Sequence, residues 1–159
     1  MRITHLTRAD YRRMRWRNGG GWTTELARHP DGADDATFDW RISLADVEQD
    51  GEFSAWPGYA RSIVLLEGNG MELLFGADMP VLLRQHGQVH AFAGEAAARC
   101  RLVDGPTRDF NVFTRRTACS HRVMFRPLVG PMVLFPERGV LWLVHVVAGA
   151  AHQQQAAPG

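Results

Sequence analysis

Short segments in which apolar and polar residues alternate run through most of the chain, and this period of two is the feature that most restricts its fold. Phe38, Trp40, Ile42 and Leu44 alternate with polar residues and predict one such strand at 38–44. Further apolar segments lie at 22–27, 61–67, 71–75, 81–84, 89–92, 98–102, 109–114, 121–126, 131–135 and 140–147. Many short strands separated by turn signals predict an all-β barrel or sandwich.

Turn residues between these segments predict which strands pair. Gly68-Asn-Gly70 separates 61–67 from 71–75, and a turn near Gly87 separates 81–84 from 89–92. Each pair therefore predicts a β-hairpin. Pro131 makes 131–135 an edge strand or a short one.

Two terminal segments depart from the strand pattern. Thr7-Arg-Ala-Asp10 resembles a helix capping box, with Asp in place of Glu, and predicts a short helix at 8–14. The last residues, 151–159, are small and polar and predict a flexible tail.

Charge and length exclude several classes of protein. A length of 159 residues fits one domain, and a net charge of +1 argues against nucleic-acid and membrane partners. All 18 basic residues are arginine, which excludes lysine Schiff-base chemistry. We find no signal peptide and no apolar run of the ~20 residues that a membrane span needs, so we expect a cytoplasmic protein. Cys100 and Cys119 are expected to be free thiols.

Metal and covalent chemistry find little support in the residue pattern. Among the seven histidines only His86 and His90 are close in sequence, with Glu95 beyond them, and two histidines flanking a turn favour surface positions over a metal site. No G-x-S-x-G motif occurs, and Cys100 lies on an apolar strand face. We therefore predict no metal, no cofactor and no catalytic residues.

Three consecutive glycines form the most unusual local motif. Gly19, Gly20 and Gly21 follow Asn18 and lie between two tryptophans. They fit either a turn or bulge alone, or a turn whose backbone also forms the wall of a ligand pocket. The arginines just before them, four in residues 12–17, favour a solvated face over a phosphate-binding patch.

Arg61 is the most informative single residue. It stands at the head of the most apolar strand, where a charge is costly unless it is paired. Its partner is either a rim or internal carboxylate, such as Glu25 or Asp109, or a bound anionic ligand. Asp109 and Asn111 share one face of a predicted strand and would offer hydrogen bonds if that face points inward.

Three ordered stretches together resemble the HutD/Ves family. They are Trp16-x-Asn18-Gly-Gly-Gly21-x-Thr23-Thr-Glu25-Leu26; Trp40-Arg-Ile-Ser43-x-Ala45 with Asp50-Gly-x-Phe53-Ser54 and Pro57-Gly58-x-x-Arg61; and Asp104-Gly-Pro106-x-x-Asp109-Phe-Asn111-Val. The resemblance covers about residues 14–116.

This resemblance implies a bicupin, that is, two fused jelly-roll-like cupin barrels in one domain over 1–150. The first barrel would span about 1–78 and the second about 79–150. The family is associated with bacterial histidine utilisation and lacks the metal-ligand signature of cupins. It implies a non-catalytic protein that binds a small carboxylate metabolite, such as urocanate or formylglutamate.

In this reading Arg61 pairs with the ligand carboxylate. Hydrogen bonds would come from Asn18, Thr24, Asp109 and Asn111, with Gly19, Gly20 and Gly21 letting the backbone approach. Two alternatives stay open: a cupin-type enzyme, either a metal-free isomerase or a metal-dependent oxygenase or hydrolase, and a regulator that contacts another protein. A homodimer through a barrel face is compatible with the pattern.

Overall fold

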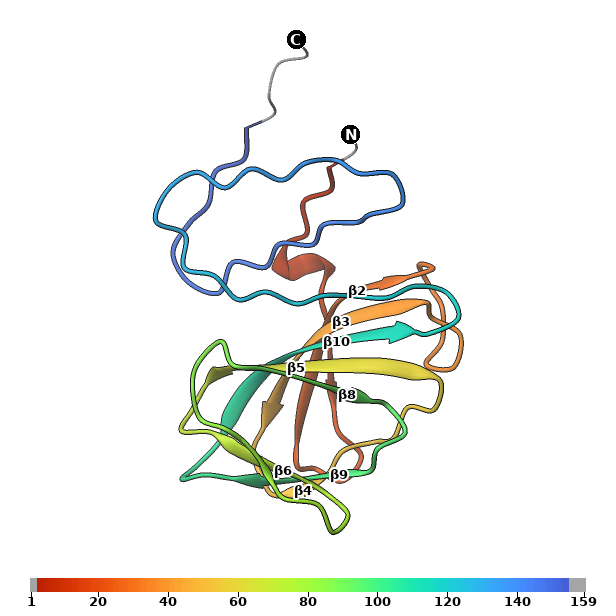
Figure 1. Ribbon diagram of the computed structural model, residues 1–159, viewed down its shortest axis with the longest axis vertical. Helices are drawn as coiled ribbons and strands as arrows, with labels where there is room; N and C mark the ends of the chain where they lie inside the picture. Colours follow the sequence, from red (N-terminus) through yellow and green to blue (C-terminus); the bar gives the residue numbers. More distant parts are fainter. Residues whose placement is uncertain (1–2, 155–159) are drawn as a thin grey trace. The chain divides into compact units, whose positions relative to one another are not determined.

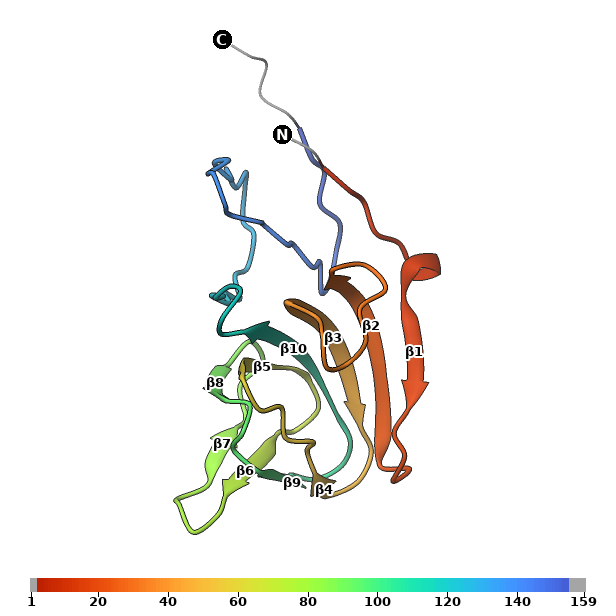
Figure 2. The same ribbon diagram turned by 90° about the vertical axis from the view of Figure 1, so that its right-hand side faces the viewer.

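Ten strands within residues 4–126 form two antiparallel sheets in the computed structural model, which describes residues 3–154. The first sheet contains, in spatial order, β1 (Arg12–Arg15), β2 (Gly21–His29), β3 (Trp40–Val47), β10 (Thr107–Arg115), β5 (Tyr59–Glu67) and β8 (Val89–Ala93). The second contains β4 (Gly51–Glu52), β9 (Ala98–Leu102), β6 (Met71–Phe75) and β7 (Val81–Leu83). Figures 1 and 2 show the larger sheet curving around one side of this unit, with β4, β6 and β9 opposite it.

The main core lies between the two sheets. Alternate residues of β3 and β5, among them Val47, Ile63 and Leu65, pack against Met71 and Leu73 of the smaller sheet. All of these are at most 1% exposed. The inward-facing positions of the larger sheet are therefore the odd-numbered residues of β3, β5 and β10.

The other face of the larger sheet carries a second apolar cluster. Ile42 and Val112 are register partners across β3 and β10, and they pack with Leu26. Trp40, Leu44 and Phe110 cover this cluster and are only partly buried. Trp40, Ile42 and Leu44 of the predicted strand 38–44 therefore face away from the main core, whereas Arg41 and Ser43 face the interior.

The predicted hairpins are wrong, although their strands form. β5 pairs with β10 and β8, whereas β6 pairs with β7 and β9. The chain crosses from one sheet to the other at Gly68 and Gly70, both with positive φ, and crosses back between β7 and β8. A glycine turn supports a change of sheet as readily as a hairpin, so turn chemistry alone does not fix pairing.

The predicted helix at 8–14 is wrong beyond its first turn. Thr7 caps a single 3-10 turn, Arg8–Asp10, and the expected capping box with Asp10 is present. Residues 12–15 instead form β1, which pairs with β2. Strand pairing thus overrides a local helix-start signal.

The structure does not show the expected division into two barrels near residue 78. Strands from before and after this point pair within both sheets, because β10 lies between β3 and β5, and β9 lies between β4 and β6. Residues 4–126 form one unit, and residues 3 and 127–154 belong to a second.

The second unit is irregular over the residues that the structure describes. The strands predicted at 131–135 and 140–147 are absent from it, and the strand predicted at 121–126 is absent from the first unit. Large apolar side chains such as Val129 and Phe135 are exposed here. Of the predicted tail, residues 151–154 have no regular structure and the rest lie outside the described residues. Within residues 3–154 we find no helix of the length and apolarity required to span a bilayer.

The glycine run supports a testable packing argument. Gly21 begins β2 opposite Val47, and a Cβ there would overlap the backbone oxygen of Asp46 and lie 3.2 Å from the Trp16 ring. We expect Gly21→Ala to destabilise the protein by about 1–3 kcal/mol, measured by urea denaturation. Gly20→Ala is the matched control, because its nearest neighbour would be Asn18 Oδ1 at an ordinary 3.4 Å. Equal effects of both substitutions would contradict this explanation.

Candidate functional site

Arg61 points into the interior and is only 7% exposed. Its guanidinium lies over three rings, 4.8 Å from the centroid of Phe53, 5.1 Å from Phe92 and 4.9 Å from Phe113. Both of its hydrogen bonds go to Asn111 Oδ1, from Nε at 3.2 Å and from Nη2 at 2.8 Å. Aromatic faces and an amide oxygen stabilise a cation without neutralising it.

Asn111 connects Arg61 to a buried carboxyl group. Its Nδ2 donates to Asp109 Oδ1, and Asp109 is completely buried. Asp109 Oδ2 has no hydrogen-bond partner among the described residues. The interior thus holds a chain of three side chains, Arg61–Asn111–Asp109, in which the cation and the carboxyl group do not form a direct ion pair.

Burial controls the ionisation of both ends of this chain. It lowers the pKa of Arg61 to about 10, against the charge of Asp109, so the guanidinium stays charged at neutral pH. It raises the pKa of Asp109 to about 7, although Arg61 and the hydrogen bond from Asn111 act in the opposite direction. Near neutral pH the site therefore carries a net positive charge.

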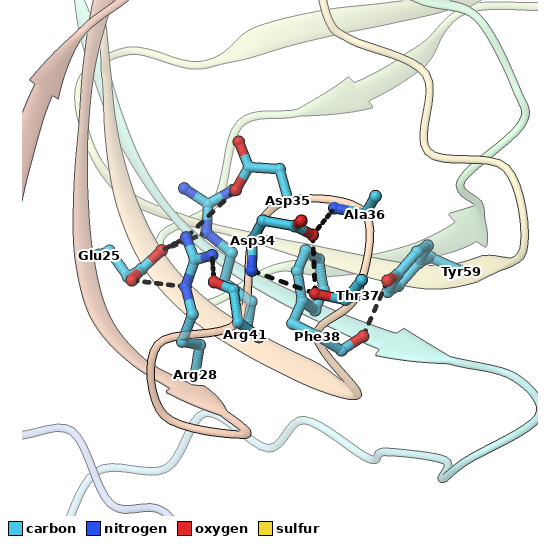
Figure 3. A network of polar contacts seen from close by, with 10 residues as sticks. Glu25, Arg28, Asp34, Asp35, Ala36, Thr37, Phe38, Arg41 and Tyr59 are labelled. Atoms are coloured by element: carbon cyan, nitrogen blue, oxygen red, sulfur yellow. Dashed lines mark hydrogen bonds and ion pairs between the residues drawn. The ribbon is translucent and has the colours of Figure 1, made fainter.

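A second network of buried polar side chains lies on β2 and β3, on the other side of β10 from Arg61. Arg41 of β3 and Arg61 of β5 are both register partners of Phe113, so the two arginines lie in one row across the sheet. Arg41 Nε donates to Glu25 Oε2 at 2.7 Å, and Arg28 makes a bidentate contact with the same carboxylate (Figure 3). The pKa of Glu25 lies below its ordinary value, because hydrogen bonds and charge from the two arginines outweigh the opposing effect of burial.

This network also holds the segment between β2 and β3 in place. Arg28 donates to the carbonyl oxygen of Ala33 and contacts Asp35 Oδ1 at 3.2 Å. Phe38, at the end of the segment, accepts a hydrogen bond from Tyr59 Oη at 2.8 Å, as Figure 3 shows. Phe38, Tyr59 and Phe113 form an aromatic cluster at this end of the interior.

A cleft of about 430 Å³ is lined by Arg61 and Phe92, together with residues of β5, β8 and the segment after β10. His121 lies at its wall and joins two strands, with Nε2 2.8 Å from Ser62 Oγ and Nδ1 2.7 Å from Thr114 Oγ1. Burial lowers the pKa of His121, which favours the neutral ring. The cleft therefore brings solvent-accessible space next to the strand that carries Arg61.

The predicted site residues fall into two groups. Arg61, Asp109 and Asn111 come together as described, because β10 pairs directly with β5. The second group lies elsewhere, at the glycine turn and on β2: Asn18, Gly19, Gly20, Gly21 and Thr24.

The register explains this separation. Gly21 pairs with Val47, and Val47 pairs with Thr107, at the opposite end of β10 from Phe113, the partner of Arg61. Asn18 Oδ1 accepts from Gly20 N at 3.0 Å, which holds the turn itself. Thr24 pairs with Leu44, on the sheet face that points away from the core.

The arginines before the turn lie on the surface, and two of them form ion pairs with acidic side chains. Arg13 pairs with Asp46 at 3.2 Å and Arg15 pairs with Glu48 at 2.8 Å. Both guanidiniums also lie over the Trp22 ring. These contacts agree with the interpretation of a solvated face.

Sequence reasoning missed the role of Arg41 and Arg28. Arg41 occupies a polar position in an alternating strand, and the usual assignment puts such positions in solvent. A signal was present, because Glu25 and Arg41 both lie within predicted strands. Two opposite charges at such positions can form an ion pair in the interior between the strands.

The histidines singled out in the sequence do not converge. His86 Nε2 lies 3.2 Å from the carbonyl oxygen of Gly68, whereas His90 stacks on Phe92 with a centroid distance of 5.6 Å. Glu95 binds Arg116 and the backbone of Gly58. Within residues 3–154 no three His, Cys, Asp or Glu side chains gather in a way that could hold a metal ion.

Comparison with known proteins agrees with this fold. The HutD family model matches residues 8–158. An uncharacterised 21.2 kDa protein in the hutC 3′ region of Pseudomonas putida is 43% identical over 107 residues, which cover 67% of this chain and 55% of the relative. Protein Ves of Cronobacter sakazakii is 37% identical over 136 residues, or 85% of this chain and 71% of the relative.

Solved structures give the same result. HutD from Pseudomonas fluorescens SBW25 superposes with a TM-score of 0.64 at 40% identity, covering 70% of this chain and 59% of that one. A conserved protein of unknown function from Pseudomonas aeruginosa PAO1 has the same TM-score at 46% identity, over 70% of this chain and 57% of that one. Ectoine synthase from P. lautus, at 15% identity and a TM-score of 0.51, covers 72% of this chain and 78% of its own and shares the fold alone.

The aligned region covers only part of each relative, and the chain spans little more than half the length of the P. putida protein. Even so, the family model covers nearly all of this chain, and the fold is all-β, as the resemblance implied. The chain belongs to the HutD family.

Proposed function

We propose that this protein binds a small carboxylate metabolite of histidine breakdown, such as urocanate or formylglutamate, and modulates that pathway without catalysing a reaction. The observation that carries the proposal is Arg61, a buried and charged guanidinium with no ion-pair partner among the described residues. A charge buried in this way is costly unless an anion offsets it, and a carboxylate matches the planar fork of donors of a guanidinium.

The surroundings of Arg61 support a carboxylate of modest size. Phe53, Phe92 and Phe113 offer flat apolar surfaces around the cation, and the adjoining cleft of about 430 Å³ falls in the range of small-molecule sites. The hut context comes from the names of the relatives from P. putida and P. fluorescens. The latter structure belongs to a formate condition, and formate is the smallest carboxylate.

Thermal denaturation with added carboxylates tests this proposal. We expect urocanate or formylglutamate to raise the melting temperature, since a ligand at 100 times its Kd stabilises the folded state by about 2.7 kcal/mol. Arg61→Met keeps most of the side-chain volume, removes the charge and should abolish the shift.

Arg13→Met is the matched control, because Arg13 is an exposed arginine paired with Asp46 on the surface. This variant should respond to ligand as the parent protein does. The absence of a shift with urocanate, formylglutamate and formate at millimolar concentration would overturn the proposal.

A further inference from the structure

Asp109 has an unusual position for a carboxyl group. Its side chain is 0% exposed, Oδ1 accepts from Asn111, and Oδ2 has no hydrogen-bond partner within the described part of the chain. Arg61 is the cation that stabilises its charge, and Asn111 lies between the two. The ionised form of Asp109 thus depends on a cation that it does not touch.

We propose that carboxylate binding at Arg61 is coupled to the uptake of one proton by Asp109. The inference rests on the proposed function and deepens it, because it identifies the proton as a second ligand of the same site. An anion seated on Arg61 offsets the charge that favours ionised Asp109, while the burial that opposes ionisation is unchanged. The two carboxylates then compete for one guanidinium, and the buried one becomes neutral.

The hydrogen bonding of Asp109 also favours its neutral form. Oδ2 is buried without a hydrogen-bond partner among the described residues. An unpaired buried oxygen costs more free energy when its group is charged than when it is neutral, so protonation reduces this cost.

Other titratable groups around the pair do not account for the same proton. Burial and the charge of Asp109 raise the pKa of Cys100 to about 12, so its thiol keeps its proton throughout. From β3, the charge of Arg41 lowers the pKa of Arg61, and the charge of Asp46 raises the pKa of Asp109. His90 of β8 and His121 at the wall of the cleft are the competitors, but burial lowers the pKa of each, so both rings are neutral above pH 7 in the free protein.

The sign of the pH dependence follows from Asp109. In the free protein its pKa is about 7, and an anion on Arg61 raises it further. Between these two values the complex holds one proton more than the free protein. Affinity should therefore fall with rising pH, by up to about tenfold per pH unit above pH 7.

Isothermal titration with urocanate, formylglutamate and formate, in buffers of different ionisation enthalpy, tests the coupling. At pH 8 we expect proton uptake approaching one per ligand. In Asp109→Asn the affinity should no longer depend on pH, whereas His90→Gln and His121→Gln should each keep both the uptake and the pH dependence.

The outcomes separate the two proposals. The absence of binding at any pH overturns the proposed function. Binding without proton uptake at pH 8, or uptake that is lost in His90→Gln or His121→Gln and kept in Asp109→Asn, overturns the coupling alone. Where Asp109→Asn does not fold, the two histidine variants decide the point, since loss of uptake in either one overturns the assignment to Asp109.

Discussion

Replacing Glu25 with glutamine is expected to destabilise the protein by about 3–5 kcal/mol, because it breaks a buried ion pair by removing one partner. The Glu25 carboxylate neutralises Arg28 and Arg41, whose side chains are only 8% and 7% exposed. The amide keeps the shape but removes the charge, so two buried guanidiniums are left facing each other. Arg28 also holds the segment before β3, so the loss extends to the aromatic cluster around Phe38.

Urea denaturation at pH 7 measures this effect. Glu48→Gln is the matched control, because Glu48 pairs with Arg15 on the surface and is 40% exposed, where an ion pair contributes less than about 1 kcal/mol. The triple variant Glu25→Gln/Arg28→Met/Arg41→Met should recover much of the loss, since it leaves no buried charge of this network unpaired. A loss below about 1 kcal/mol for Glu25→Gln would show that water reaches the two arginines.

Asp109→Asn is expected to change how stability depends on pH. The pKa of Asp109 is raised from its ordinary value of 3.8 to about 7 in the folded protein. Below pH 4 the carboxyl group is neutral in both the folded and the unfolded state. Between pH 4 and 7 the folded state holds a proton that the unfolded state has lost, so this group makes stability fall as pH rises. The full effect is on the order of 4 kcal/mol and is complete above pH 7.

The difference between the parent protein and Asp109→Asn isolates this group. Glu25 acts with the opposite sign, because its pKa is lowered and its contribution is lost as pH falls, but it is present in both proteins. The variant should therefore gain stability relative to the parent as pH rises from 4 to 7, measured by denaturation at each pH. A constant difference across this range would mean that Asp109 titrates normally in the folded protein.

The alternating pattern predicted strands better than it predicted their partners. The strand positions at 61–67, 71–75 and 98–102 are confirmed within a residue or two. The pairing was wrong where turn residues were the only guide, since Gly68 and Gly70 mark a change of sheet. Pairing depends on contacts between segments distant in sequence, such as β3 with β10, which local chemistry does not record.

The candidate site shows the same limit at the level of side chains. Arg61, Asp109 and Asn111 could be selected from sequence because each is polar within an apolar strand. Arg41 was missed, because apolar residues cover both faces of β3 and alternation alone does not tell which face is inside. The glycine run was associated with the site by residue type alone, and the register puts it at the other end of the strands.

The position of β10 has a consequence for the order of assembly during synthesis. This strand lies at the centre of the larger sheet, yet it is the last of the ten strands to emerge from the ribosome. Until residues 107–115 are available, β3 and β5 each present an open edge with unpaired backbone groups, and Arg61 lacks the Asn111 amide. Closing contacts over such sequence separations is slow, and open edges invite pairing with other chains. The pairing of β10 therefore closes both of these edges and completes the interior around Arg61 in the same late event.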